Sequence, residues 1–293
     1  MKNRTIKAGR LFIHKNGIRA GVTVFLLTLL AACGADDNAP DMPLGDRSIG
    51  FSTTVEDTQT RSGALATGNL LSMGIFAYYT GSNDWTISKK PNFMYNQEVK
   101  RSNASSPWTY SPVKYWPNNP GDKLTFFAYA PYVKEVSGSN PSFRPVTDAG
   151  YPTFNYTVPV KDNDQTDLLV SIPPLMNQTY GTNNGKVSLH MSHALTRVSV
   201  YLKSGDNVQG KQVTVFSMQA TKKAILGFRT PTPSYTKYVE WTYLNPIEMI
   251  TVSPSVTLPF AVPAVKDEKK LLADFFLLPA ARINESDHKF SIT

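Results

Sequence analysis

Residues 49–56 read Ile-Gly-Phe-Ser-Thr-Thr-Val-Glu, so larger side chains alternate with small or polar ones along this segment. Successive side chains of a β-strand point to opposite faces, and a period of two therefore predicts a strand with one buried face. Ile49, Phe51, Thr53 and Val55 would form that face. After residue 48 this alternation dominates, and no amphipathic helix of ten or more residues is evident.

Nine further segments are predicted as strands, with clusters of Pro, Gly, Asn and Ser between them. Short strands in a chain with 21 prolines and 18 glycines are typical of an all-β sandwich, which is the fold class we predict. One short helix is possible at residues 267–274. The predicted strands cover residues 73–79, 123–130, 167–172, 186–191, 194–202, 212–218, 239–243, 275–278 and 289–293.

The length of 293 residues suits one large or two modest domains. A boundary near residue 200 fits two sandwiches, over residues 49–200 and 201–293, of which the second is shorter. The sequence ends inside the predicted strand 289–293. Either a partner strand comes from elsewhere or the second sandwich is truncated, and we favour truncation.

The charge of the chain is concentrated at its N-terminus. The net charge is +8, but six basic and no acidic residues precede Cys33, and removing those six charges leaves +2. The basicity therefore belongs to a targeting segment and does not indicate a nucleic-acid partner. Charged residues make up only 18% of the chain, which is unlike a disordered protein or a coiled coil.

Residues 1–33 are predicted to be an export signal. A basic stretch ends at Arg19, an apolar run covers residues 22–32, and Leu-Ala-Ala-Cys closes the segment at Cys33. The run is too short to span a bilayer of about 30 Å as a helix. Its ending resembles a bacterial lipobox, so Cys33 is predicted to be acylated and to anchor the chain to a membrane. Residues 34–48, rich in Asp, Pro, Gly and Asn, are predicted to form a flexible tether.

No pattern in the sequence supports catalysis, a cofactor or a metal, and we predict a protein that is not an enzyme. A single cysteine excludes a disulfide framework and a Cys-based zinc cluster. His190 and His193 are three residues apart, which on a strand sends their side chains to opposite faces. Asp162, Asp164 and Asp167 loosely resemble a calcium loop, but the sharp-turn Gly and the distal Glu of that motif are missing. We therefore expect a solvated loop there.

Aromatic residues are dense between residues 108 and 132. They could form a platform on which sugars stack, or a β-sandwich core with tyrosine hydroxyls at its rim. We favour the core, because Leu124, Phe126, Ala128 and Ala130 share one face of a predicted strand. The eight aromatic residues are Trp108, Tyr110, Tyr115, Trp116, Phe126, Phe127, Tyr129 and Tyr132.

The same segment resembles the fimbrillin-like lipoproteins of Bacteroidetes. The resemblance rests on an ordered set of short matches that covers nearly the whole chain, beginning with the lipobox and with Thr60-Arg61 after the first strand. The matches continue with Trp-Thr-Tyr at 108–110, Lys-Tyr-Trp-Pro at 114–117, Leu-Thr-Phe-Phe-Ala-Tyr-Ala-Pro-Tyr at 124–132, Asp-Leu-Leu-Val at 167–170, His-Ala-Leu-Thr-Arg-Val at 193–198 and Phe-Leu-Leu-Pro at 276–279.

This resemblance implies two transthyretin-like β-sandwich domains and a structural subunit, anchor or tip adhesin of a cell-surface fimbria, a type V pilus. It implies an outer-membrane lipoprotein whose partners are other fimbrial subunits and an Arg-specific protease. That protease would cut after the first strand, at Arg61, and a strand from another subunit would fill the groove that is left. Arg47 is the weaker candidate, because a cut there leaves the strand in place. The alternative is a surface glycan-binding lipoprotein that serves polysaccharide uptake. No receptor is predicted.

Overall fold

The computed structural model describes residues 46–56, 65–206, 211–279 and 290–293. Strands dominate these residues, which confirms the predicted all-β class. The described helical elements are the single-turn α1 (Tyr180–Asn183) and the 3-10 turn η1 (Asp162–Asp164). Within the described residues no helix has the length and apolar character needed to cross a membrane.

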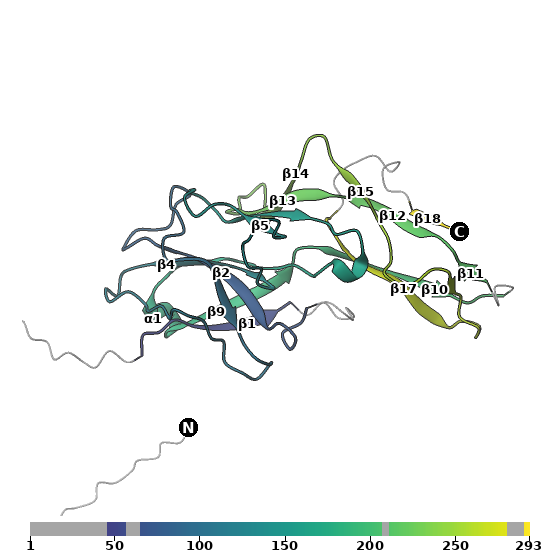
Figure 1. The fold of residues 1–293 in the computed structure, drawn as a ribbon. Coiled ribbons are helices and arrows are strands. Elements are labelled where there is room, and N and C mark those ends of the chain that lie inside the picture. The colour runs from purple at the N-terminus through teal and green to yellow at the C-terminus, as the bar shows by residue number, and fades with distance from the viewer. Residues whose placement is uncertain (1–45, 57–64, 207–210, 280–289) are drawn as a thin grey trace, which may run out of the picture. The chain divides into compact units, whose positions relative to one another are not determined.

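The largest sheet has seven strands, and its order is β1-β9-β7-β4-β2-β3, with β8 paired to β4. All pairs are antiparallel except β1 with β9, which run parallel at one edge (Figure 1). The strands are β1 (Gly50–Val55), β2 (Ser72–Tyr79), β3 (Met94–Lys100), β4 (Leu124–Ala130), β7 (Leu169–Ser171), β8 (Leu175–Gln178) and β9 (Lys186–His193).

A second sheet packs on one face of the first. Its order is β14-β13-β6-β5, and its strands are β5 (Ser142–Phe143), β6 (Thr153–Thr157), β13 (Lys223–Phe228) and β14 (Val239–Tyr243). The ring of Phe127 in β4 lies 4.9 Å from that of Phe228, and the ring of Tyr129 lies 5.2 Å from that of Phe154. These contacts between the two sheets make the sandwich core.

Strand β4 supplies both faces of the large sheet, and all seven of its residues are buried. Phe127 and Tyr129 point into the core between the sheets. Phe126 and Ala128, one residue out of phase, belong to a second core on the other face together with Trp116. Alternate residues of one strand therefore serve two cores, which explains why this segment is so rich in aromatic residues.

Seven described strands remain after residue 195 besides those of the second sheet, in three small groups. β10 pairs with β17, β11 pairs with β16, and β12 lies between β15 and β18. Their bounds are β10 (Thr196–Lys203), β11 (Gln212–Val213), β12 (Phe216–Thr221), β15 (Met249–Val252), β16 (Phe260–Ala261), β17 (Lys269–Leu277) and β18 (Phe290–Ile292).

Two expectations change in this region. The possible helix at 267–274 is wrong, because residues from Lys269 onward form β17, whose backbone pairs with eight residues of β10. Non-local pairing here overrides the helix-forming Lys, Leu, Ala and Glu composition. The predicted strand 289–293 has a partner within the chain, since β18 pairs with β12 and the Thr293 carbonyl accepts from the Thr214 N–H at 2.8 Å.

Strand pairing crosses the predicted domain boundary at residue 200. β13 follows that residue in the sequence, yet it pairs with β6 over five residues. The buried cluster between the two sheets also includes residues from both sides, from Phe76 to Leu278. These contacts join residues from both sides of position 200. The division into sandwiches over 49–200 and 201–293 remains a prediction.

Candidate assembly interface

The backbone of β1 is held from one side. Its ladder partner among the described strands is β9, in register from Gly50 opposite Lys186 to Val55 opposite Met191. Two side chains bond to the ends of its other edge. The Tyr110 hydroxyl donates to the Ile49 carbonyl at 2.9 Å, and the Val55 N–H donates to the Thr67 hydroxyl at 2.9 Å. An edge strand held in this way can leave without disrupting a ladder between two other strands.

The side chains of β1 alternate as predicted. Ile49, Phe51 and Val55 are 1%, 5% and 9% exposed. The Phe51 ring lies edge-on to the rings of Tyr110 at 5.5 Å and Phe126 at 6.3 Å. These three side chains therefore lie in the second core, on the face of the sheet opposite the sandwich core.

Polar residues of β1 divide between the two faces. Ser52 bonds to the Ser188 hydroxyl and Thr54 bonds to His190 Nδ1, both at 3.0 Å on the exposed face. Thr53 faces the core instead, and its buried hydroxyl has no hydrogen-bond partner among the described residues. The core face of β1 therefore includes one polar atom that the rest of the described chain leaves unsatisfied.

The contacts of β1 extend back into the predicted tether. The Trp116 N–H donates to the Arg47 carbonyl and the Ile49 N–H donates to the Lys114 carbonyl, each at 2.9 Å. The Arg47 guanidinium lies 4.6 Å from the centre of the Tyr180 ring and also donates to the Pro117 carbonyl. The peptide bond after Arg47 therefore lies in a paired, half-buried segment.

Cys33 and Arg61 lie outside the described residues, but the residues on either side of segment 57–64, which contains Arg61, are described. The Glu56 N–H donates to the Met191 carbonyl at 2.8 Å, next to the end of β1. The Leu65 N–H donates to Asp167 Oδ2 at 3.0 Å. Both neighbours of segment 57–64 are thus bonded to the large sheet or to its adjoining segments.

The two histidines have separate partners. His193 Nδ1 lies 2.7 Å from Asp167 Oδ2, and both side chains are buried. His190 lies on the exposed face of β9 against Thr54. No spacing in the sequence indicated the Asp167–His193 pair. Asp167 precedes β7, and His193 ends the neighbouring strand β9, where it is opposite Leu169.

The acidic loop that resembles a calcium loop bonds to backbone groups. Asp162 accepts hydrogen bonds from the Ser255 N–H at 2.7 Å and the Asp274 N–H at 3.2 Å. Gln165 accepts from the Phe276 N–H at 2.7 Å. The loop therefore connects to β17, rather than being solvated throughout as expected. Among the described residues, no three His, Cys, Asp or Glu side chains are grouped so that they could hold a metal.

Most of the dense aromatic segment is core. Trp116, Phe126, Phe127 and Tyr129 are at most 2% exposed, which confirms the preferred interpretation. Tyr115 is 60% exposed, unlike these four residues. The segment therefore does not present a set of exposed rings as a sugar-stacking platform.

Comparison with known proteins places this fold in a family. The model of a family described as fimbrillin-like matches residues 53–270. The chain is 30% identical over 218 residues to the fimbrium subunit Fim1C of Phocaeicola vulgatus, a match that covers 68% of this chain and 55% of that protein. The chain thus spans about half the length of this curated relative.

A solved structure has the same fold. It is a fimbrial protein from Bacteroides vulgatus, superposed with a TM-score of 0.57 at 22% identity, over 84% of this chain and 87% of that one. The likeness at this identity concerns the fold, whereas the family match covers well over half of the sequence. The chain belongs to the fimbrillin-like family.

Proposed function

We propose that this chain is a structural subunit, anchor or tip adhesin of a cell-surface fimbria. Its membership of the fimbrillin-like family supports this role. The observation that carries the proposal is the state of β1, whose apolar side chains are buried while its backbone pairs along one edge only. Such a strand can be exchanged for a similar strand from another subunit.

The proposed trigger is cleavage after Arg61 by an Arg-specific protease. After that cut, β1 and the residues before it would be held by non-covalent contacts alone. Burial of Ile49, Phe51 and Val55 contributes about 5–9 kcal/mol, at roughly 1.5–3 kcal/mol for each side chain. Departure of β1 would expose an apolar groove and leave one edge of β9 unpaired, which is costly unless another strand fills the groove.

The groove favours a donor strand of defined pattern. The register places Phe51 beside Val187, Thr53 beside Leu189 and Val55 beside Met191. A replacement strand would therefore need apolar or small residues at every second position.

Cys33 is the proposed lipid attachment site, and it precedes β1 in the chain. Loss of β1 after a cut at Arg61 would therefore release the subunit from an outer-membrane anchor. Cys33→Ala should leave unprocessed precursor or release the protein from membranes. Mass spectrometry of the membrane fraction should find an acylated peptide that begins at Cys33. Unchanged processing and membrane retention of Cys33→Ala would contradict this assignment.

N-terminal sequencing of surface material tests the cleavage. Treatment with an Arg-specific protease should produce a new terminus at Ser62, and Arg61→Ala should abolish it. Arg47→Ala is the matched control and should leave the cut unchanged, because the Arg47 backbone is paired with Trp116. A mature form that always retains residues 49–61 would instead identify a non-polymerising anchor, cap or adhesin.

A further inference from the structure

The groove that β1 fills receives one polar side chain on its core face. Ile49, Phe51, Thr53 and Val55 alternate onto that face, and Thr53 is the polar one of the four. The register places Thr53 beside Leu189 of β9, which is 1% exposed. The Thr53 hydroxyl oxygen is buried and has no hydrogen-bond partner among the described residues. The natural occupant of the groove is therefore imperfect at this position.

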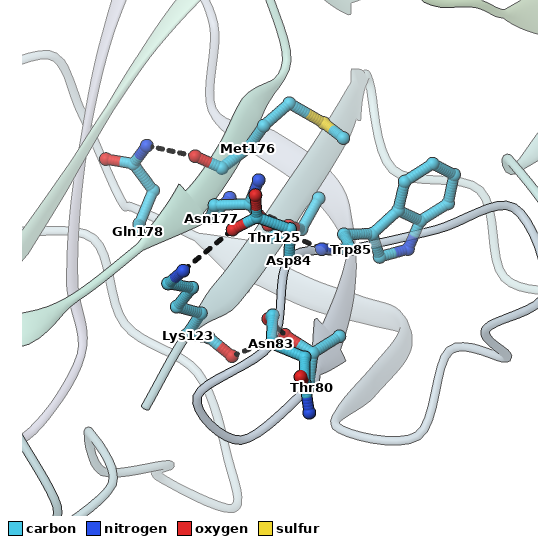
Figure 2. Close-up of polar contacts among 9 residues, drawn as sticks. All are labelled: Thr80, Asn83, Asp84, Trp85, Lys123, Thr125, Met176, Asn177 and Gln178. Atoms are coloured by element: carbon cyan, nitrogen blue, oxygen red, sulfur yellow. Dashed lines mark hydrogen bonds and ion pairs between the residues drawn. The ribbon is translucent and has the colours of Figure 1, made fainter. Parts of the chain in front are cut away.

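Two other buried threonines, in and next to the large sheet, have partners for their hydroxyls. The Thr80 hydroxyl donates to the Asn83 carbonyl at 2.7 Å, and the Asn177 N–H donates to the Thr125 hydroxyl at 2.9 Å (Figure 2). Thr80 and Thr125 are 7% and 0% exposed. The described surroundings of Thr53 offer no such group. They therefore suit an apolar side chain better than the threonine that they hold.

The missing hydrogen bond weakens the binding of β1 in its groove. In a strand exposed to water the Thr53 hydroxyl bonds to water, and burial removes that bond without a replacement. Valine has nearly the shape of threonine but carries a methyl group in place of the hydroxyl, so it leaves no polar atom unsatisfied. A strand with valine at this position should therefore bind about tenfold more tightly than β1, which corresponds to about 1.4 kcal/mol.

The other polar contacts of β1 would be open to any strand that took its place. The hydroxyls of Tyr110 and Thr67 bond to backbone groups at the two ends of β1, and β9 pairs with its backbone between them. Backbone contacts give affinity but do not distinguish one side chain from another. On the exposed face, Thr54 bonds to His190, where water competes for the same groups. Selection among strands therefore depends on the core face, where Thr53 interrupts the apolar pattern.

We propose that the groove is built for a strand of another fimbrial subunit that carries a valine-sized apolar residue at the position of Thr53, and that this strand displaces β1. The inference rests on the strand exchange proposed above and names the position that gives the exchange its direction. While β1 is joined to the chain, its high effective concentration outweighs one unsatisfied hydroxyl. A cut between β1 and β2 removes that advantage, and the difference at Thr53 then favours the incoming strand.

The test uses the full chain, purified in detergent, with a site for a sequence-specific protease introduced into segment 57–64. This site frees β1 without relying on Arg61. The probes are three synthetic peptides that cover residues 46–56, with the natural sequence, with Thr53→Val or with Thr54→Val, each labelled with a fluorophore at its N-terminus. Thr54→Val is the matched control, because it makes the same replacement at the next residue, on the exposed face. Fluorescence anisotropy after the cut measures how far each peptide displaces the N-terminal fragment at equilibrium.

The Thr53→Val peptide should displace the fragment with an equilibrium constant about tenfold larger than that of the natural peptide. The Thr54→Val peptide should be no better than the natural one, because it loses a bond on the exposed face and gains nothing in the core. Equal displacement by the two substituted peptides would refute the role of Thr53 and leave strand exchange standing. If no peptide displaces the fragment, strand exchange itself is wrong, and the preference inferred here is wrong with it.

Discussion

Replacing Phe51 with alanine should destabilise the uncut chain by about 3 kcal/mol. Large buried aromatic residues cost roughly 3–5 kcal/mol when truncated to alanine. Phe51 is 5% exposed and packs against the rings of Tyr110 and Phe126. We expect the lower end of the range because β1 lies at an edge, where the half-buried Tyr110 can move toward the space that is left.

Urea unfolding followed by circular dichroism measures this loss, with Ser52→Ala as the matched control. Ser52 is the next residue of the same strand, but its hydroxyl bonds to Ser188 on the exposed face. Its removal should change the free energy of unfolding by less than about 1 kcal/mol. A loss below about 1 kcal/mol for Phe51→Ala in the uncut chain would refute the argument from burial.

The same pair of variants tests the removal of β1. Once the chain is cut after Arg61 and the N-terminal fragment has left, wild type and Phe51→Ala have identical remaining sequences. Their free energies of unfolding should then be equal. A difference of about 3 kcal/mol that persists after cleavage would mean that β1 stays bound to β9, and strand exchange would be wrong.

Three further outcomes follow from buried polar groups. Thr53→Val removes a buried hydroxyl that has no described partner and should raise the free energy of unfolding by about 1 kcal/mol. If urea unfolding instead gives a lower free energy of unfolding, the hydroxyl has a partner outside the described residues. Asp167→Ala removes the acceptor of the buried His193 and should lower the free energy of unfolding by about 3 kcal/mol. The urea midpoint should fall, and an unchanged midpoint would contradict this. Burial raises the pKa of Tyr78 and Tyr129 above the ordinary tyrosine pKa of about 10, which the unfolded chain keeps. The free energy of unfolding should therefore fall as the pH rises above about 10, because the unfolded chain loses these protons first. A melting temperature that stays constant from about pH 9 to 11 would contradict this.

The local sequence was sufficient to predict β1 and β4. In β1 the period of two matches one buried face, and in β4 a run that is apolar except for Thr125 matches burial on both faces. The pattern failed where pairing partners are distant. β6 and β13 are short and were missed, although Phe154 and Leu226 are fully buried opposite each other. Their stability comes from a sheet that joins segments about 70 residues apart.

The same difference between local pattern and distant pairing applies to the residues around the candidate interface. The β1 face could be predicted because Ile49, Phe51 and Val55 are close in sequence and carry their own periodicity. The buried Asp167–His193 pair could not, since the two residues are brought together only when β7 pairs with β9. No motif in the sequence relates these two residues, which are 26 positions apart.

The position of β1 in both the sequence and the sheet explains why a single cut could detach it. Both β1 and β3 end the strand order of the large sheet. β3 follows β2 and precedes β4, so it stays tethered at both ends unless the chain is cut twice. β1 precedes every other described strand, and one cut between Val55 and Ser72 separates it covalently from the rest. The departing piece would also take Arg47 and Ser48, and with them the bonds to residues 114–117. A donor that reproduced only β1 would leave the Trp116 N–H without the Arg47 carbonyl, and a full replacement therefore needs one or two extended residues before its apolar pattern begins.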